Sequence, residues 1–365
     1  MIRFNNDYNH GAHPAILEAL SHTNDTQFSG YGTDEWCEKA EQLILDQCQC
    51  PQGRVYFFPG ATQANLVTIA AFLGSCDSVI CATDAGREGE STFLGSCDSV
   101  ICAVTGHING HECASIENTG HKILALPQQD GKITAGQIEK EARAYYEAGE
   151  AEWLTRPSLV YISFTTEYGT LYSKAELTAI SEVCRKYGMA LFVDGARLAY
   201  GLASPENDLT LPDLARLADA FYLGGTKCGA LFGEALVLTH PETVRRFKAS
   251  MKQNGAVLAK GWLLGLQFCT LLQDGLYFKM AARADAFALK IRDAFRKKGI
   301  PEYVVSPTNQ QFVLLTPEQA AHLEKKYAFE REGTLEDGRL LVRFCTSWST
   351  KEGEVEALVA DIANA

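Results

Sequence analysis

The chain is short of positive charge. Its 365 residues include 33 Lys and Arg against 45 Asp and Glu, which gives a formal net charge of −12. No basic cluster interrupts this balance, which argues against a nucleic-acid-binding surface. The sequence also lacks an apolar run long enough to cross a bilayer, and residues 1–7 lack the apolar core of a signal peptide. We therefore expect a cytoplasmic protein that acts on small molecules, with neither a nucleic-acid nor a membrane partner.

Two common sequence motifs are also missing. The 12 cysteines contain no Cys-x-x-Cys pair, and Cys48 and Cys50 are the one close pair. Most other cysteines, such as Cys184 and Cys269, fall inside apolar patterns, so we expect reduced, buried thiols and no metal site. No Gly-x-Gly-x-x-Gly fingerprint opens a helix, so a nucleotide-binding α/β protein is a disfavoured interpretation of the sequence.

The order of the apolar patterns indicates an α/β fold. Helical signals alternate with short apolar strands through the first three quarters of the chain, as in βα units on a mostly parallel sheet. The pattern then changes to a long amphipathic helix over 281–298 and strand-like segments 311–315 and 340–344. Because a chain of this length exceeds one core, we expect a large domain, residues 1–275, and a smaller α+β domain, residues 276–365.

One βα unit can be followed residue by residue. Ser173 and Glu176 form a capping box that starts a helix, and Gly188 ends it. An apolar strand over 189–193 then leaves Asp194 at its carboxyl end. Open α/β sheets bind ligands beyond the carboxyl ends of their strands, so this aspartate is placed where a ligand would bind.

Two segments carry the chemistry. Asp194 ends a strand, where a carboxylate can pair with a protonated ring nitrogen. The glycine-rich turn in residues 222–229 contains Lys227, whose amine can form a Schiff base. Together these segments look like the two halves of a pyridoxal phosphate (PLP) site. A strand over 55–58 leads into a helix from Thr62, and the exposed amides at such a helix start suit a phosphate.

An internal repeat stands out, because residues 72–82 recur identically as residues 93–103. A perfect copy that occurs once indicates a tandem duplication rather than a solenoid. Both copies carry the same strand, so they compete for a single position in the sheet. We favour the second copy, because it leaves the connection from the strand to His107 short.

The segments together resemble the threonine aldolase and β-eliminating lyase family of fold-type I PLP enzymes. The resembling pieces are residues 28–32, 58–65, 105–107, 193–197, 225–227 and 341–343. Their order and spacing make the resemblance specific, and it covers nearly the whole chain apart from the duplicated stretch. It implies an aspartate aminotransferase-like large domain with a mostly parallel sheet and a smaller C-terminal α+β domain.

The resemblance implies a role for each residue around the ring. Lys227 would hold PLP as a Schiff base, Asp194 would pair with the pyridine nitrogen, and Arg197 would bond the phenolic oxygen. His107 would stack on the ring and, like an ordered water, is a candidate catalytic base. Each residue also has a plainer interpretation. Lys227 could be a surface lysine and Asp194 a helix N-cap. Arg197 could be a solvated arginine and His107 a structural histidine. His111 could share a helical face with His107, but a solvated residue is favoured.

The resemblance also implies the phosphate and substrate contacts. Ala61, Thr62 and Thr226 would bind the phosphate. Alternatively, the turn before the helix could simply connect the strand to the helix. Arg343 would clamp the substrate carboxylate with a bidentate fork, its alternative being an edge-strand arginine. Asn6 occupies the place where relatives offer a small polar side chain to the same carboxylate.

The expected partners are an amino acid and further copies of the chain. Enzymes of this fold usually build each site at a dimer interface, so Tyr31 and Lys260 would approach the cofactor of a neighbouring subunit. The resemblance therefore implies a homodimer or homotetramer with shared active sites.

The resemblance implies aldol cleavage of a β-hydroxy-L-amino acid, similar to threonine or allo-threonine, into glycine and an aldehyde. One departure affects the substrate: better-known threonine aldolases carry a histidine after the central strand, whereas residues 164–172 contain Glu167 and no histidine. The motifs leave two alternatives open, namely β-elimination on another amino acid and a catalytically impaired relative that serves as an oligomeric partner.

Overall fold

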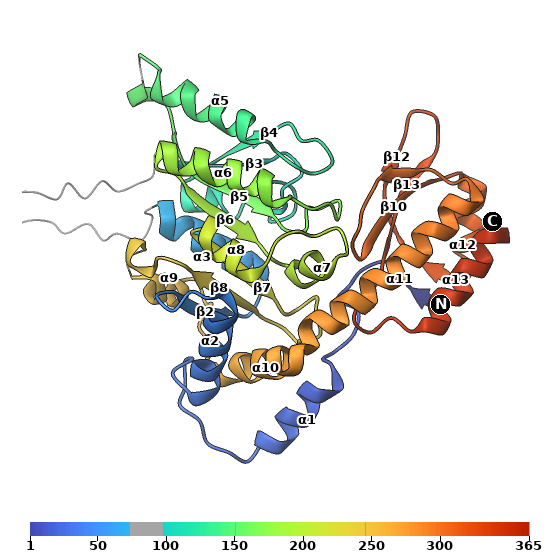
Figure 1. Ribbon diagram of the computed structural model, residues 1–365, viewed down its shortest axis with the longest axis horizontal. Helices are drawn as coiled ribbons and strands as arrows, with labels where there is room; N and C mark the ends of the chain where they lie inside the picture. Colours follow the sequence, from blue (N-terminus) through green and yellow to red (C-terminus); the bar gives the residue numbers. More distant parts are fainter. Residues whose placement is uncertain (74–97, 150, 245, 365) are drawn as a thin grey trace, which may run out of the picture.

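The computed structural model describes residues 1–73, 98–149, 151–244 and 246–364. Its centre is a seven-stranded sheet in the order β2-β8-β7-β6-β5-β3-β4 (Figure 1). The strands are β2 (Arg54–Phe58), β3 (Asp98–Ala103), β4 (Lys122–Leu126), β5 (Arg156–Ser163), β6 (Ala190–Asp194), β7 (Ala220–Gly224) and β8 (Glu234–Leu238). Strand β8 is antiparallel to both neighbours, and the pairs from β7 to β4 are parallel. The predicted α/β fold with a mostly parallel sheet is confirmed.

Helices cover both faces of this sheet. Successive residues of a strand point to opposite faces, so neighbouring residues pack against different helices. Val160 and Ile162 of β5 belong to one hydrophobic cluster, whereas Leu159 and Tyr161 belong to another. The first cluster includes residues of α1 (Pro14–Thr23), α2 (Glu35–Cys48), α5 (Ala135–Tyr146), α6 (Lys174–Tyr187), α7 (Leu198–Ala203), α8 (Leu211–Leu217) and α10 (Trp262–Leu272). The second includes residues of α3 (Ala61–Leu73), α4 (His107–Gly110) and α9 (Phe247–Gln253).

The βα unit that leads to Asp194 forms as predicted. Ser173 and Glu176 make both hydrogen bonds of the capping box at the start of α6, and Gly188 ends the helix with a left-handed φ of 63°. Strand β6 follows, and Asp194 is its last residue. Of the two copies of the duplicated strand, the second enters the sheet as predicted: it forms β3, which pairs with β4 and β5. The competing strand of the first copy lies outside the described residues.

A second, smaller sheet lies in the C-terminal part of the chain. Its order is β12 (Glu330–Thr334), β13 (Leu340–Cys345), β10 (Gln310–Leu315) and β9 (Glu302–Val304), and neighbouring strands are antiparallel. Helices α11 (Leu276–Lys298), α12 (Pro317–Leu323) and α13 (Glu352–Asn364) pack with it around one core. This agrees with the expected smaller α+β unit.

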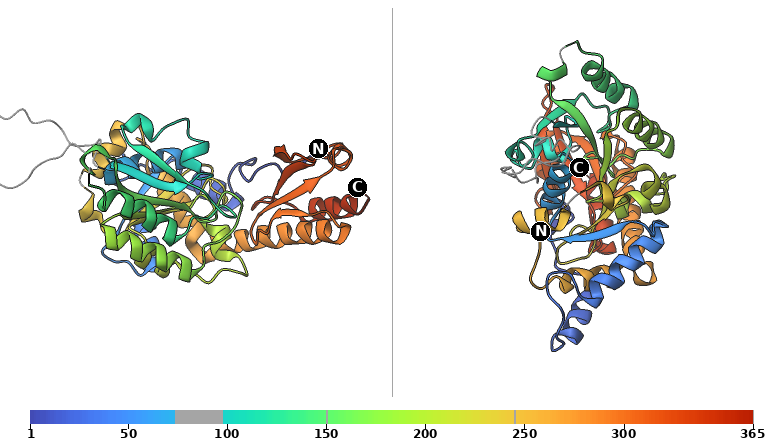
Figure 2. Two further views of the ribbon diagram at one scale, coloured as in Figure 1. Left: turned by 90° about the horizontal axis from the view of Figure 1, so that it is seen from above. Right: turned by 90° about the vertical axis from the view of Figure 1, so that its left-hand side faces the viewer.

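The long helix α11 runs from the large sheet to the small one (Figures 1 and 2). It begins at Leu276 rather than at Ala281, because Tyr277 and Met280 extend its buried face toward the N-terminus. The N-terminal strand β1 (Ile2–Arg3) pairs with β11 (Tyr327–Ala328), so the first residues of the chain lie in the C-terminal unit. A domain boundary between residues 275 and 276 stays a prediction.

Two sequence-based expectations concern the thiols and membranes. Nine cysteines in the described ranges are free; eight of them are buried, and Cys113 is exposed. Across the same ranges, every helix is too short or too polar to span a bilayer.

Candidate active site

A cavity of about 790 Å³ brings together side chains from the large sheet and from the small one. It lies at the carboxyl ends of β6 and β7, where Asp194 ends one strand and Lys227 follows the other. Arg343 reaches it from β13 of the small sheet. Its lining includes these predicted site residues: Ala61, Thr62, His107, Asp194, Arg197, Thr226, Lys227 and Arg343. Asn6 is the exception, because its side chain instead accepts a hydrogen bond from the Tyr8 amide at 3.1 Å.

Lys227 stands in a tight turn that the sheet holds in place. The Gly225 amide donates to Oε2 of Glu234 at 3.0 Å, and the Tyr200 hydroxyl donates to the Lys227 carbonyl oxygen at 2.7 Å. Burial, followed by the nearby Arg197 cation, lowers the pKa of the Lys227 ammonium. A larger fraction of this lysine is therefore the uncharged, nucleophilic amine.

Asp194 is a buried carboxylate with three hydrogen-bond donors. The Tyr161 hydroxyl and the Asn65 amide donate to Oδ2 at 2.5 and 3.0 Å, and the Ala196 amide donates to Oδ1 at 2.9 Å. Burial by itself would raise the pKa of Asp194, but the His107 charge and these hydrogen bonds lower it below its usual range. Asp194 thus stays ionised although it is 4% exposed.

Arg197 is paired with a residue that the sequence analysis missed. Its Nε and Nη2 donate to the two oxygens of Asp7 at 2.8 and 3.1 Å, and the Asn309 amide adds a bond to Asp7 at 3.0 Å. Both partners are buried, at 8% and 1% exposure. The ion pair ties the N-terminal segment to the wall of the cavity, close to Lys227.

His107 opens the short helix α4 and is held by a second residue that the sequence analysis missed. Its Nδ1 lies 2.8 Å from Oε1 of Glu112. Burial by itself would lower the pKa of His107, but the bond to Glu112 and the charges of Glu167 and Asp194 raise it. His111 also lines the cavity, and it is exposed as the favoured interpretation expected.

The expected phosphate region combines a helix start with a buried acid. Ala61 and Thr62 form the first turn of α3, where backbone amides lack partners within the helix. Thr226 donates its hydroxyl to Glu234 at 2.7 Å, so this hydroxyl is already engaged. Burial raises the pKa of Glu234 to about 8, which makes it largely protonated at neutral pH.

Arg343 offers a partly satisfied guanidinium. Its Nη1 lies 3.3 Å from Glu332 of β12, and its Nη2 donates to the Asn5 carbonyl oxygen at 3.3 Å. Within the described residues, its buried Nε finds no hydrogen-bond acceptor. A carboxylate ligand would satisfy this donor.

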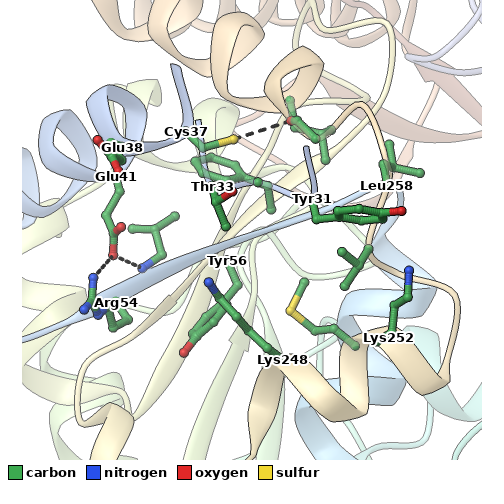
Figure 3. A pocket seen from close by; sticks show the side chains of 17 residues that line it. Tyr31, Thr33, Cys37, Glu38, Glu41, Arg54, Tyr56, Lys248, Lys252 and Leu258 are labelled. Carbon is green, nitrogen blue, oxygen red and sulfur yellow. Dashed lines mark hydrogen bonds and ion pairs between the residues drawn. The ribbon is translucent and has the colours of Figure 1, made fainter. Parts of the chain in front are cut away.

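A second cavity, of about 680 Å³, lies between α2, β2 and α9 (Figure 3). Tyr31 is at its edge, 56% exposed, with the Lys252 ammonium 4.5 Å from the ring centre. The Tyr31 amide donates to the carbonyl oxygen of Ala259, the residue before Lys260, at 3.1 Å. Tyr31 therefore lies close to the backbone next to Lys260, and neither residue belongs to the lining of the cavity that contains Lys227.

The residues of the Lys227 cavity fit PLP. The cavity presents an amine of lowered pKa, an ionised carboxylate and a helix start to one space. Thr105 and Arg343 line the same space, and each has a buried polar atom that lacks a partner in the described part of the chain. A polar, phosphorylated, carbonyl-bearing cofactor would satisfy these groups. Fold and cavity together define the class of PLP-dependent enzymes of the aspartate aminotransferase type.

Comparisons with known proteins identify the family. The family model described as beta-eliminating lyase matches residues 11–317. A low specificity L-threonine aldolase of a Pseudomonas species is 27% identical over 373 residues, covering 99% of this chain and 96% of the relative. A solved threonine aldolase from Leishmania major is 39% identical with a TM-score of 0.90, covering 100% of this chain and 99% of that one. Aspartate aminotransferase from Thermus thermophilus, 12% identical with a TM-score of 0.67 over 100% of this chain and 91% of its own, shares the fold.

The chain belongs to the beta-eliminating lyase family, which includes the threonine aldolases and depends on PLP.

Proposed function

We propose that the protein cleaves β-hydroxy-L-amino acids of the threonine type into glycine and an aldehyde. The observation that carries the proposal is that one cavity holds Lys227, Asp194 and Arg343, which can bind a PLP-dependent enzyme's cofactor and the carboxylate of an amino acid. The names of its relatives support the same reaction, because they are threonine aldolases from two Pseudomonas strains and Leishmania major.

The cofactor contacts are part of the proposal. Lys227 would bond PLP covalently through Nζ, and Asp194 would pair with the ring nitrogen. The helix start at Ala61 and Thr62 would hold the phosphate. Arg197, already fixed by Asp7, would present its remaining donor to the ring oxygen. When bound, PLP withdraws electrons from the α-carbon of an attached amino acid.

Arg343 binds and orients the substrate. Its guanidinium receives the substrate carboxylate through the donor that otherwise lacks a partner, which fixes one substituent of the α-carbon. Fixing that substituent aligns the Cα–Cβ bond for cleavage, so binding energy is converted into orientation.

His107 receives the proton of the β-hydroxyl group at Nε2, because Nδ1 is engaged by Glu112. The O–H electrons form the carbonyl group of the aldehyde, and the electrons of the Cα–Cβ bond pass to Cα. The proton that His107 accepted is then returned to Cα, which gives glycine, so atoms and charge balance. Glu167 belongs to the stretch 164–172, which lacks the histidine of the better-known aldolases; it lines the cavity, and its charge faces His107.

The location and assembly of the protein are proposed on separate grounds. The net charge of −12 and the absence of a membrane-spanning helix in the described ranges support a cytoplasmic enzyme. Tyr31, close to the backbone next to Lys260, lines a cavity that a second copy of the chain can cover, which supports a homodimer or homotetramer.

Product analysis tests the reaction. The purified protein with PLP and L-threonine or L-allo-threonine is expected to yield glycine and acetaldehyde in equal amounts. Ammonia and a 2-oxo acid would instead indicate β-elimination and overturn the proposal. Lys227→Ala is expected to lose the activity, whereas Lys140→Ala, which changes an exposed lysine of α5, keeps it.

A further inference from the structure

Glu112 is a buried carboxylate beside the cavity. Its side chain is fully buried, and it receives hydrogen bonds from three groups. His107 Nδ1 and Asn65 Nδ2 each lie 2.8 Å from Oε1, and the Ser115 hydroxyl donates to Oε2 at 3.2 Å. A buried carboxylate with this many donors is held in one orientation, so it can hold its partners in one orientation as well.

Asn65 connects this carboxylate to Asp194. Its amide nitrogen donates one hydrogen to Oε1 of Glu112 at 2.8 Å and the other to Oδ2 of Asp194 at 3.0 Å. The reversed amide would point its oxygen at two acceptors, so the two carboxylates themselves fix which way Asn65 faces. His107, Glu112, Asn65 and Asp194 thus form one continuous chain of hydrogen bonds.

The proton on His107 follows from this chain. The Glu112 oxygens accept hydrogen bonds from Asn65 and Ser115, and the contact of Oε1 with His107 is completed when the hydrogen of neutral His107 sits on Nδ1. The lone pair is then on Nε2, the nitrogen left for the cavity that His107 lines. The other charged or titratable groups facing His107 are Glu167, Asp194 and the His111 ring, whose centre is 5.5 Å away.

We propose that Glu112 is a positioning residue for the cleavage reaction. It fixes the Nδ1–H form of His107 and strengthens Nε2 as the acceptor of the β-hydroxyl proton. Asn65 links this base to the carboxylate that serves the cofactor ring. The inference rests on the proposed function. Since Glu112 lies outside the cavity lining, its removal changes proton transfer rather than substrate binding.

The test compares Glu112→Gln with the matched control Ser115→Ala, which removes a hydrogen bond to Oε2 but leaves the charge. In Glu112→Gln, kcat is expected to fall at least about tenfold while KM changes less than about twofold. The acidic limb of kcat/KM moves to lower pH, because the anion that raises the pKa of His107 is gone. Ser115→Ala keeps the wild-type profile. A rise in KM with an unmoved pH profile overturns the proposal.

A measurement on the full-length wild-type protein needs no activity. Nitrogen chemical shifts of ¹⁵N-histidine-labelled protein, assigned with His107→Asn, are expected to report the Nδ1–H form at high pH. The titration midpoint of His107 is expected to fall in Glu112→Gln, because the hydrogen bond and charge that raise the pKa of His107 are removed. An Nε2–H form, or an unchanged midpoint, overturns the inference even if the enzyme cleaves threonine. The Nδ1–H form and the lowered midpoint can both be found while the protein releases no glycine. That outcome would refute the proposed reaction but not the chain of hydrogen bonds.

Discussion

Asp7 and Arg197 form a buried, bidentate ion pair although they lie 190 positions apart in the chain. Asp7 follows the N-terminal strand β1, which pairs with β11 in the C-terminal part of the chain, and Arg197 follows β6 of the large sheet. The pair therefore joins the N-terminal segment to the large sheet at the cavity. It also places a negative charge beside the two cations Arg197 and Lys227, which moderates their mutual repulsion.

Removal of one partner should be costly. Asp7→Ala leaves the Arg197 guanidinium buried without its counter-charge, so the free energy of unfolding is expected to fall by about 3–5 kcal/mol in urea titrations. Asp337→Ala removes an exposed pair with Arg339 and is expected to cause no measurable loss. Equal effects of the two substitutions would contradict the structural importance of the buried pair.

The same pair predicts a pH dependence of stability. Burial alone would raise the pKa of Asp7, but Arg197 and Lys227 lower it from its usual 3.8 to about 2. A folded-state pKa below the unfolded value gives stability that is present above about pH 4 and is lost as the pH falls toward 2. The unfolding free energy of wild type should therefore drop more steeply across this window than that of Asp7→Asn, measured by urea titration at each pH.

Asp194 provides a test of the cofactor site. Asp194→Asn keeps the size of the side chain but removes its charge, so the ring nitrogen loses its counter-ion. We expect kcat to fall roughly tenfold to a hundredfold or more, in line with the loss of a charge-assisted hydrogen bond. Tyr161→Phe removes one donor and leaves the charge, and is expected to cost less. A fully active Asp194→Asn enzyme would argue against the assigned role.

Arg343 and Glu332 should affect substrate binding in opposite directions. Arg343→Gln removes the cation expected to bind the substrate carboxylate, and KM should rise about tenfold or more. Glu332→Gln removes the negative charge that lies 3.3 Å from Nη1 of Arg343 and repels a carboxylate bound at Nε, so KM should fall. Steady-state kinetics with L-threonine measure both effects. A rise in KM in Glu332→Gln would mean that Glu332 holds Arg343 in place instead.

The duplication predicts a tolerated deletion. Removal of residues 72–92 joins Ala71 to Phe93, and the sequence at the end of α3 and in β3 is unchanged. Because the second copy already supplies the strand, the unfolding free energy is expected to change by less than about 1 kcal/mol. Loss of the folded protein would mean that the intervening residues contribute to the sheet or to its connection.

Local signals predicted the parts of the site that are tied to strand ends. Asp194 could be placed because its helix has a capping box and a glycine stop, and its strand is an unbroken apolar run. Lys227 follows the buried strand β7 in the same way. The sequence did not reveal that β8 is antiparallel, because a strand buried on both faces has the same apolar pattern in either direction.

The same local sequence signals could not predict contacts between distant residues or within irregular segments. Asp7 meets its partner through the fold, so nothing near it in the sequence indicates an ion pair. Glu112 stands five positions from His107, in a stretch without apolar periodicity where Cys113 and Ala114 adopt positive φ. Asn65 lay inside a matched segment, but its bonds to two carboxylates depend on how α3 packs against the sheet. Such polar networks carry no periodic signal.

The assignment of the Lys227 cavity as the active site is tested most directly by locating the cofactor on the chain. The protein is incubated with PLP, reduced with borohydride and digested, and the labelled peptide is identified by mass spectrometry. We expect the pyridoxyl group on Lys227, in the peptide that contains the Gly225-Thr226 turn. A label on another lysine, or a protein that takes up no label, would contradict the assignment of this cavity as the active site.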